Sequence, residues 1–155
     1  MGRVEGKVAF VTGAARGQGR SHAVRLAEEG ADIIAIDICD QIVTVPFPMA
    51  SPADLEQTVK EVEALDRRIV AVQADVRDYD ALKSAVDAGV AELGRLDIVS
   101  ANAGIAGGNR PSWEQSEQEW HNTIDVNLTG VWHTVKAAVP HLLAGERGGS
   151  IVLTS

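Results

Sequence analysis

The chain has 155 residues, a net charge of −8 at pH 7 and 45% hydrophobic residues, which predicts one acidic domain with a substantial core. The negative charge argues against nucleic acid as a partner, and apolar runs no longer than a strand predict no membrane span. A single cysteine, Cys39, suits a reducing cytoplasm, and the four histidines lack the spacing of a metal site.

A strand, a glycine-rich turn and a helix are predicted at the start of the chain. A short apolar run ends at Thr12, and the glycines after it are spaced Gly13-x-x-x-Gly17-x-Gly19. Helical spacing then continues to Gly30, a residue typical of helix ends. This order of elements presents backbone N–H groups and a helix N-terminus to a pyrophosphate. A purely structural turn is the alternative.

The second predicted strand, 31–37, ends in Asp37, where a carboxylate can bind the adenosine ribose of a dinucleotide. The segment 38–50 contains two prolines and no helical period, so it is predicted to be a long loop. Its apolar residues are expected to fold over the adenosine half of a cofactor or, alternatively, to pack on their own domain.

Helices and strands alternate through the rest of the chain, with capping residues at Ser51, Asp78 and Ser116. The predicted elements are helices 52–65, 78–93 and 117–143 and strands 69–74, 96–101 and 150–154. This alternation predicts an α/β protein with a Rossmann-type doubly wound parallel sheet, forming one dinucleotide-binding domain over 1–155. Because that fold commonly has six strands and five are predicted, we expect a domain truncated after the fifth strand, without its C-terminal part.

Apolar residues at helical spacing form a stripe on the last predicted helix, which we expect to face the core or a subunit interface. The stripe consists of Trp120, Ile124, Leu128, Val131, Val135 and Val139. Three tryptophans, Trp113, Trp120 and Trp132, are expected to serve packing rather than to form a substrate platform.

Four motifs in this order resemble the short-chain dehydrogenase/reductase family across the whole chain. They are Thr12–Gly19, Asp75-Val76, Asn102-Ala103-Gly104 and Asn127. The stretch Gly17-Gln18-Gly19-Arg20-Ser21-His22-Ala23, in which Gln18 replaces the commoner aliphatic residue, and the loop at 38–50 resemble the mycofactocin-coupled or carveol-dehydrogenase-like subgroup.

The resemblance implies an NAD(H)-dependent oxidoreductase that transfers hydride between NAD and a secondary alcohol or ketone. It also implies a homo-oligomer, paired through the helices around 82–93 and after Ser116. The implied cofactor-binding residues are Gly13, Arg16, Gln18, Gly19, Asp37, Asp75, Val76, Asn102, Ala103 and Gly104. In the family, the residue matching Asn127 belongs to a catalytic set with serine, tyrosine and lysine.

Several of these residues have structural alternatives. Asp75 could instead cap the helix after it, and Asn102 and Asn127 could satisfy buried backbone groups. Arg16 could meet the 2′-phosphate of NADP, but Asp37 is expected to dominate at contact distance and to favour NAD.

The chain departs from the family in lacking a Tyr-x-x-x-Lys motif, since Tyr79 lies in another motif and no lysine follows Lys136. The 155 residues are therefore expected to bind the cofactor without completing the chemistry. A non-catalytic dinucleotide-binding protein is the alternative function. A sugar epimerase is disfavoured, because those relatives resemble Gly-x-x-Gly-x-x-Gly.

Overall fold

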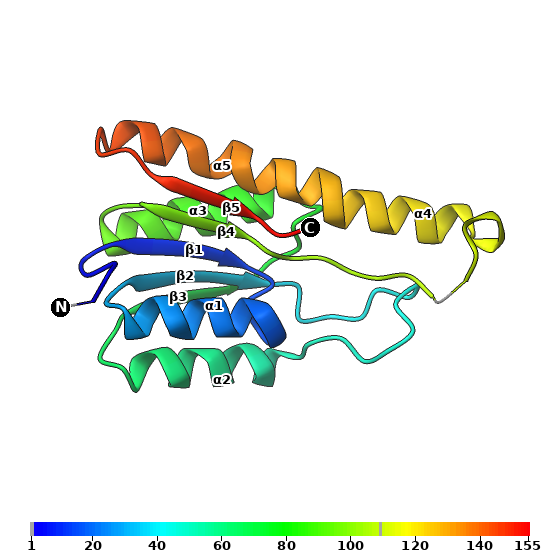
Figure 1. Ribbon diagram of the computed structural model, residues 1–155, viewed down its shortest axis with the longest axis horizontal. Coiled ribbons are helices and arrows are strands. Elements are labelled where there is room, and N and C mark those ends of the chain that lie inside the picture. The colour runs from blue at the N-terminus through cyan, green and yellow to red at the C-terminus, as the bar shows by residue number, and fades with distance from the viewer. Residues whose placement is uncertain (1, 109) are drawn as a thin grey trace.

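The computed structural model describes residues 2–108 and 110–155, and a five-stranded parallel sheet lies at its centre (Figure 1). The strands are β1 (Val8–Thr12), β2 (Asp32–Asp37), β3 (Ile69–Gln73), β4 (Ile98–Ala101) and β5 (Ser150–Leu153). Their order across the sheet is β3-β2-β1-β4-β5, and all neighbours pair in parallel. Successive strands are therefore added to one side of β1 as far as β3 and then to its other side from β4 onward. Ligands of such sheets bind outside the carboxyl ends of the strands at this switch point between β1 and β4.

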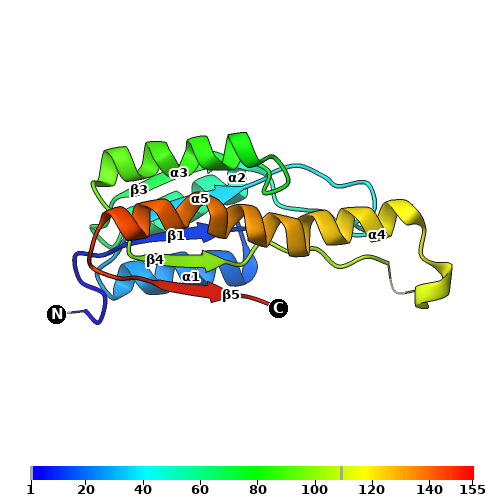
Figure 2. The same ribbon diagram turned by 90° about the horizontal axis from the view of Figure 1, so that it is seen from above.

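Helices cover both faces of the sheet, as the doubly wound prediction requires. Helices α1 (Gly17–Glu28) and α2 (Pro52–Glu63) pack together on one face, and α3 (Tyr79–Leu93) and α5 (Gly130–Ala144) on the other. A 3₁₀ turn, η1 (Ser112–Glu114), precedes α4 (Glu117–Ile124), which joins α5 through the π-helical turn η2 (Asp125–Thr129). Figure 2 shows α4 projecting past the ends of the strands. No helix in the described parts of the chain is long and apolar enough to span a membrane.

The predicted capping residues begin the helices as expected. Ser51 accepts a hydrogen bond from the Asp54 N–H, and the Asp54 carboxylate accepts one from the Ser51 N–H. Ser116 and Glu119 form the same reciprocal pair at the start of α4, and Asp78 caps α3. These side chains satisfy backbone donors that a helix leaves free at its start.

The sheet separates two hydrophobic clusters, because successive side chains of a strand point to opposite faces. Phe10 joins Leu82 and Val99 beneath α3 and α5. Val11 joins Val62 and other residues beneath α1 and α2. All five residues of β1 are buried, so the strand that precedes the glycine turn lies in the middle of the molecule.

The apolar stripe predicted for the last helix is wrong as a core face. Trp120 and Leu128 are exposed, and Val131, Val135 and Val139 are only partly buried. The buried residues of this helical stretch are smaller on average and include Val126, Gly130, Thr134, Ala137, Ala138 and Leu142. Small side chains allow the helix to lie close to the sheet, so hydrophobicity alone selected the wrong face.

The prediction that the three tryptophans pack is also wrong, at least within this chain. Trp113, Trp120 and Trp132 are 83%, 58% and 55% exposed. Trp132 still makes local contacts on the surface, where the Lys136 ammonium lies 4.7 Å from its ring centroid. A cation over an aromatic face is attracted by the ring quadrupole, which explains this pairing outside the core.

Candidate cofactor-binding site

A cavity of about 330 Å³ lies where β1 to β4 end. It is bordered by the start of α1 and by the loop between β2 and α2. Ten of the residues predicted from the sequence line it: Gly13, Arg16, Gln18, Gly19, Asp37, Asp75, Val76, Asn102, Ala103 and Gly104. Residues distant in the sequence thus lie together where the strand order switches between β1 and β4.

The glycine turn tolerates no side chain at two of its positions. Gly13 has a φ of 66°, and a Cβ there would come within 2.9 Å of the Ala103 Cα. A Cβ on Gly19 would overlap the carbonyl oxygen of Gly13. Close packing of turn, helix and β4 therefore requires glycine at both positions.

Helix α1 begins at this cavity without a side-chain cap. Its N-cap residue, Arg16, makes no capping hydrogen bond, whereas α2, α3 and α4 are each capped by a serine or an aspartate. Backbone N–H groups at the start of a helix carry partial positive charge and bind anions. The geometry suits a phosphate group at the mouth of the cavity.

Asp37 presents a fixed carboxylate to the same cavity and is only 7% exposed. One carboxylate oxygen accepts a hydrogen bond from the Ala15 N–H, and the other accepts one from the Cys39 N–H, both at 3.0 Å. Burial and the nearby Asp37 raise the pKa of the Cys39 thiol to about 11, so it is neutral at pH 7 and unsuited to act as a nucleophile.

Thr12 joins the ends of β1 and β4 beneath the cavity. Its hydroxyl oxygen accepts hydrogen bonds from the N–H groups of Asn102 and Ala103, each at 3.0 Å. The Asn102 side-chain amide in turn donates to the Thr12 carbonyl at 3.0 Å. These three bonds hold together the two strands between which the cavity opens.

Asp75 belongs to a polar chain that reaches the loop 38–50. Arg77 binds the Asp75 carboxylate and donates to Asn122 of α4 at 3.4 Å, and this hydrogen bonding to Asp75 raises the pKa of Arg77. The Asn122 amide donates to the Thr44 hydroxyl at 3.0 Å. Asp78 rather than Asp75 caps α3, so the capping alternative for Asp75 is wrong.

The loop 38–50 does fold over the cavity and also packs into the core. Ile42 and Val45 are buried and line the cavity together with the half-buried Met49. Gln41 holds the loop in shape, because its side-chain amide donates to three loop carbonyls and accepts a hydrogen bond from the Met49 N–H. The segment therefore packs on its own domain, as one alternative expected, while its place over the adenosine half of a cofactor stays a prediction.

Comparison with known proteins identifies the family of the chain. A family model described as short chain dehydrogenase matches residues 7–155. The chain belongs to the short-chain dehydrogenase family. A (−)-trans-carveol dehydrogenase of Rhodococcus erythropolis is 59% identical over 155 residues, covering 100% of this chain and 56% of the relative. The chain thus spans about half the length of such relatives.

Solved structures of other short-chain dehydrogenases agree with this fold. Carveol dehydrogenase from Mycobacterium avium, in complex with NAD, superposes with a TM-score of 0.98 and 64% identity, over 100% of this chain and 56% of that one. A short-chain dehydrogenase from Mycobacterium paratuberculosis, bound to NAD, gives a TM-score of 0.94 and 54% identity, over 97% and 55%. The resemblance inferred from the four motifs is confirmed.

Asn127, which the family resemblance places in a catalytic set, lies in the π-helical turn η2. Its side-chain oxygen accepts a hydrogen bond from the Ile105 N–H, and its amide donates to the Ile105 carbonyl, both at 2.8 Å. The side chain therefore fixes the segment after β4, and Ile105 itself lines the cavity. Asn127 thus satisfies backbone groups as the structural alternative expected, but these groups and Asn127 itself are exposed rather than buried.

Sequence reasoning gave no role to several residues that shape this site. Thr12 accepts a hydrogen bond from the Asn102 N–H, 90 residues away. Gln41 accepts one from the Met49 N–H, eight residues away, and Asn122 donates to the Thr44 hydroxyl, 78 residues away. Only Thr12 carried a signal, because it ends a buried strand directly before the glycine turn. The partners of the other two are set by tertiary structure alone.

Proposed function

We propose that the chain forms the NAD site of a short-chain dehydrogenase that transfers hydride between NAD and a secondary alcohol or ketone. The observation that carries the proposal is the buried Asp37 carboxylate facing the same cavity as the uncapped start of α1. A dinucleotide needs both features, a carboxylate for the ribose hydroxyls and a helix N-terminus for the pyrophosphate. The two NAD-bound neighbours add support.

In this proposal, different groups of residues bind different parts of the cofactor. The turn with Gly13, Arg16, Gln18 and Gly19 would bind the pyrophosphate. Asp37 would accept hydrogen bonds from the adenosine ribose. Asp75 and Val76, which follow β3 next to β2, would border the adenine ring. Asn102, Ala103 and Gly104, which follow β4, would line the cleft toward the nicotinamide.

The chemistry follows from a hydride acceptor held beside an alcohol. NAD, when bound, supplies the acceptor for the hydride from the carbinol carbon, while the hydroxyl proton must pass to a general base. We propose that Asn127 belongs to the catalytic set by holding Ile105 at the cleft. In the family the base is a tyrosine with a lysine four residues later, a motif absent from these 155 residues.

A terpene-like secondary alcohol is the proposed substrate class, because one relative is a (−)-trans-carveol dehydrogenase. We further propose a cytoplasmic homo-oligomer. Exposed apolar side chains on α4 and η2, such as Trp120 and Leu128, support an assembly.

Titration calorimetry with NAD and NADP tests the proposal. NAD should bind at least about tenfold tighter than NADP, a gap of about 1.4 kcal/mol, because Asp37 repels a 2′-phosphate. Absence of NAD binding would overturn the proposed function. Equal affinities would mean that Asp37 does not contact the ribose.

A second measurement separates an enzyme from a protein that only binds the dinucleotide. The protein purified from its natural gene is incubated with NAD and a panel of secondary alcohols while NADH absorbance is followed. NADH formation supports the oxidoreductase. Tight NAD binding without turnover of any alcohol would favour the non-catalytic alternative.

A further inference from the structure

We infer that Arg20 is a positioning residue that fixes the Ala14–Ala15 turn against α2 and thereby sets the place of the Asp37 carboxylate. The inference rests on the proposed function, because it concerns how this site selects its dinucleotide. Arg20 does not line the cavity, so its effect on a ligand passes through Ala15 and Asp37.

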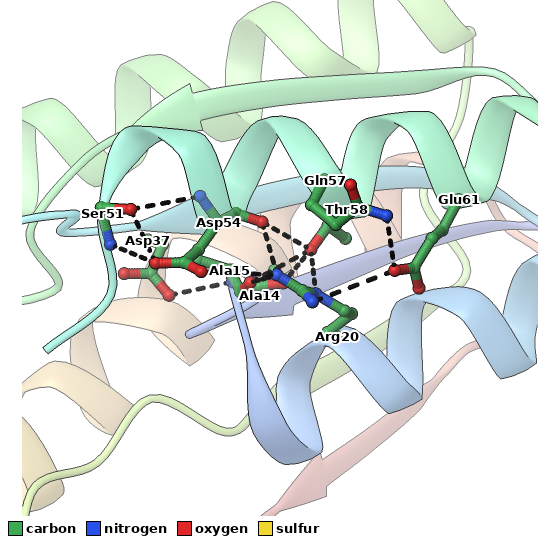
Figure 3. A network of polar contacts seen from close by, with 9 residues as sticks. All are labelled: Ala14, Ala15, Arg20, Asp37, Ser51, Asp54, Gln57, Thr58 and Glu61. Atoms are coloured by element: carbon green, nitrogen blue, oxygen red, sulfur yellow. Dashed lines mark hydrogen bonds and ion pairs between the residues drawn. The ribbon is translucent and has the colours of Figure 1, made fainter.

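Arg20 lies in α1 and bridges the glycine turn to α2, as Figure 3 shows. Its Nε donates to the Thr58 hydroxyl at 3.0 Å, and one terminal nitrogen donates to the carbonyl oxygens of Ala15 and Asp54. The carboxylates of Asp54 and Glu61 lie 4.0 and 3.9 Å from the guanidinium. The side chain is only 24% exposed, so these contacts are partly shielded from water.

Thr58 completes the bridge from the side of α2. It is fully buried, and its hydroxyl donates to the Ala14 carbonyl at 2.9 Å while accepting from Arg20. The two carbonyls of the turn are therefore each held by a side chain, Ala14 by Thr58 and Ala15 by Arg20 (Figure 3). Because Arg16 makes no capping hydrogen bond at the start of α1, these contacts to the two carbonyls are the side-chain bonds that hold the turn against α2.

The same residue, Ala15, links this bridge to the ribose carboxylate. Its N–H donates to one oxygen of Asp37 at 3.0 Å, while its carbonyl accepts from Arg20. Because both polar groups of Ala15 are engaged, the orientation of its backbone determines where Asp37 finds its donor. If Arg20 is lost, the Ala15 carbonyl keeps only a longer contact with the Thr58 hydroxyl at 3.3 Å, so the Ala15 backbone and the Asp37 carboxylate are held less firmly.

Lysine is a poor substitute in this position. The guanidinium directs separate N–H groups at a hydroxyl and at two carbonyls, whereas an ammonium is a single point donor on a flexible stem. Arg20→Lys therefore keeps the positive charge near Asp54 and Glu61 but loses the fork. Comparison of this variant with Arg20→Met separates geometry from charge.

The test measures NAD and NADP affinities by calorimetry, and stability by urea unfolding, in Arg20→Lys, Arg20→Met and Thr58→Val. Arg25→Met is the control, because Arg25 lies on the same helix but is 71% exposed and pairs with Glu28 away from the turn. The Arg20 variants should weaken NAD about tenfold, the effect of losing one charge-assisted hydrogen bond, and should narrow the NAD-to-NADP ratio. Thr58→Val should also lower the NAD affinity and narrow the NAD-to-NADP ratio, whereas Arg25→Met should change neither quantity.

An unchanged NAD-to-NADP ratio in folded Arg20→Lys and Arg20→Met, even with reduced stability, would show a merely structural role and overturn the inference. If the Arg20 variants do not fold, Thr58→Val decides, since it removes only one hydroxyl. Failure of the unmutated protein to bind NAD would instead overturn the proposed function.

Discussion

Replacement of Asp37 by serine should remove the preference for NAD and destabilise the protein at the same time. The carboxylate would lie beside the 2′-phosphate of NADP, and such like charges cost several kcal/mol when juxtaposed. A preference of about tenfold requires only about 1.4 kcal/mol, so loss of the charge is sufficient to abolish it. The change should come chiefly from tighter NADP binding, because serine can still bond one ribose hydroxyl.

The cost in stability follows from the two backbone donors at the carboxylate. Ala15 and Cys39 each donate to Asp37 at 3.0 Å, and the carboxylate is 7% exposed. A shorter serine side chain has one oxygen and cannot reach both N–H groups, so at least one buried donor is left unpaired. An unpaired buried donor costs about 1–3 kcal/mol, which should appear in the free energy of unfolding.

Calorimetric titration with NAD and NADP gives the ratio, and urea unfolding gives the stability. Asp40→Ser is the matched control, because it makes the same charge change three residues away on an exposed loop residue. If Asp37→Ser keeps the unmutated NAD-to-NADP ratio, or if Asp40→Ser shifts that ratio as much, the assignment of Asp37 to the ribose is refuted.

Three further predictions follow from the structure. Thr12→Val should lower the free energy of unfolding by about 2–4 kcal/mol in urea, because two N–H groups lose their acceptor, whereas Thr12→Ser should stay near the unmutated value. If both variants lose the same stability, the acceptor is not the cause. Burial raises the pKa of Asp97, but hydrogen bonds from Arg95 and the Val8 N–H outweigh burial and lower it. The charged Asp97 therefore stabilises the fold above about pH 4, and this stabilisation is lost as pH falls further. Asp97→Asn should therefore lower the free energy of unfolding in urea at pH 7 by about 1–3 kcal/mol, and the difference should shrink as the pH falls through the lowered pKa of Asp97; a pH-independent difference would contradict this. The 155-residue chain itself should give no steady NADH formation with secondary alcohols, because general acid–base catalysis alone contributes about 10²- to 10⁴-fold; turnover that survives removal of contaminating enzymes would refute the assignment of missing groups.

Local signals made much of this fold predictable. Apolar runs identified all five strands, and Ser51, Asp78 and Ser116 marked the starts of three helices because each supplies an acceptor for free backbone N–H groups. The ten cavity residues were found because parallel strands end at one edge of the sheet, so motifs after separate strands meet there.

Features that depend on tertiary packing were not predictable in the same way. The last helix buries Thr134 and Ala137 rather than the larger Val135, since close approach to the sheet favours small side chains over hydrophobic ones. The π-helical turn that carries Asn127 has no sequence signal, although such turns are frequent at functional sites. No role for Arg20 was predictable, because its partners Thr58 and Asp54 lie on another helix.

A structure of the protein determined with NAD tests the central claim most directly. The account predicts that both hydroxyls of the adenosine ribose lie within about 2.6–3.2 Å of the Asp37 carboxylate and that the pyrophosphate lies against the start of α1. NAD bound outside this cavity, or bound with its adenosine ribose away from Asp37, would contradict it.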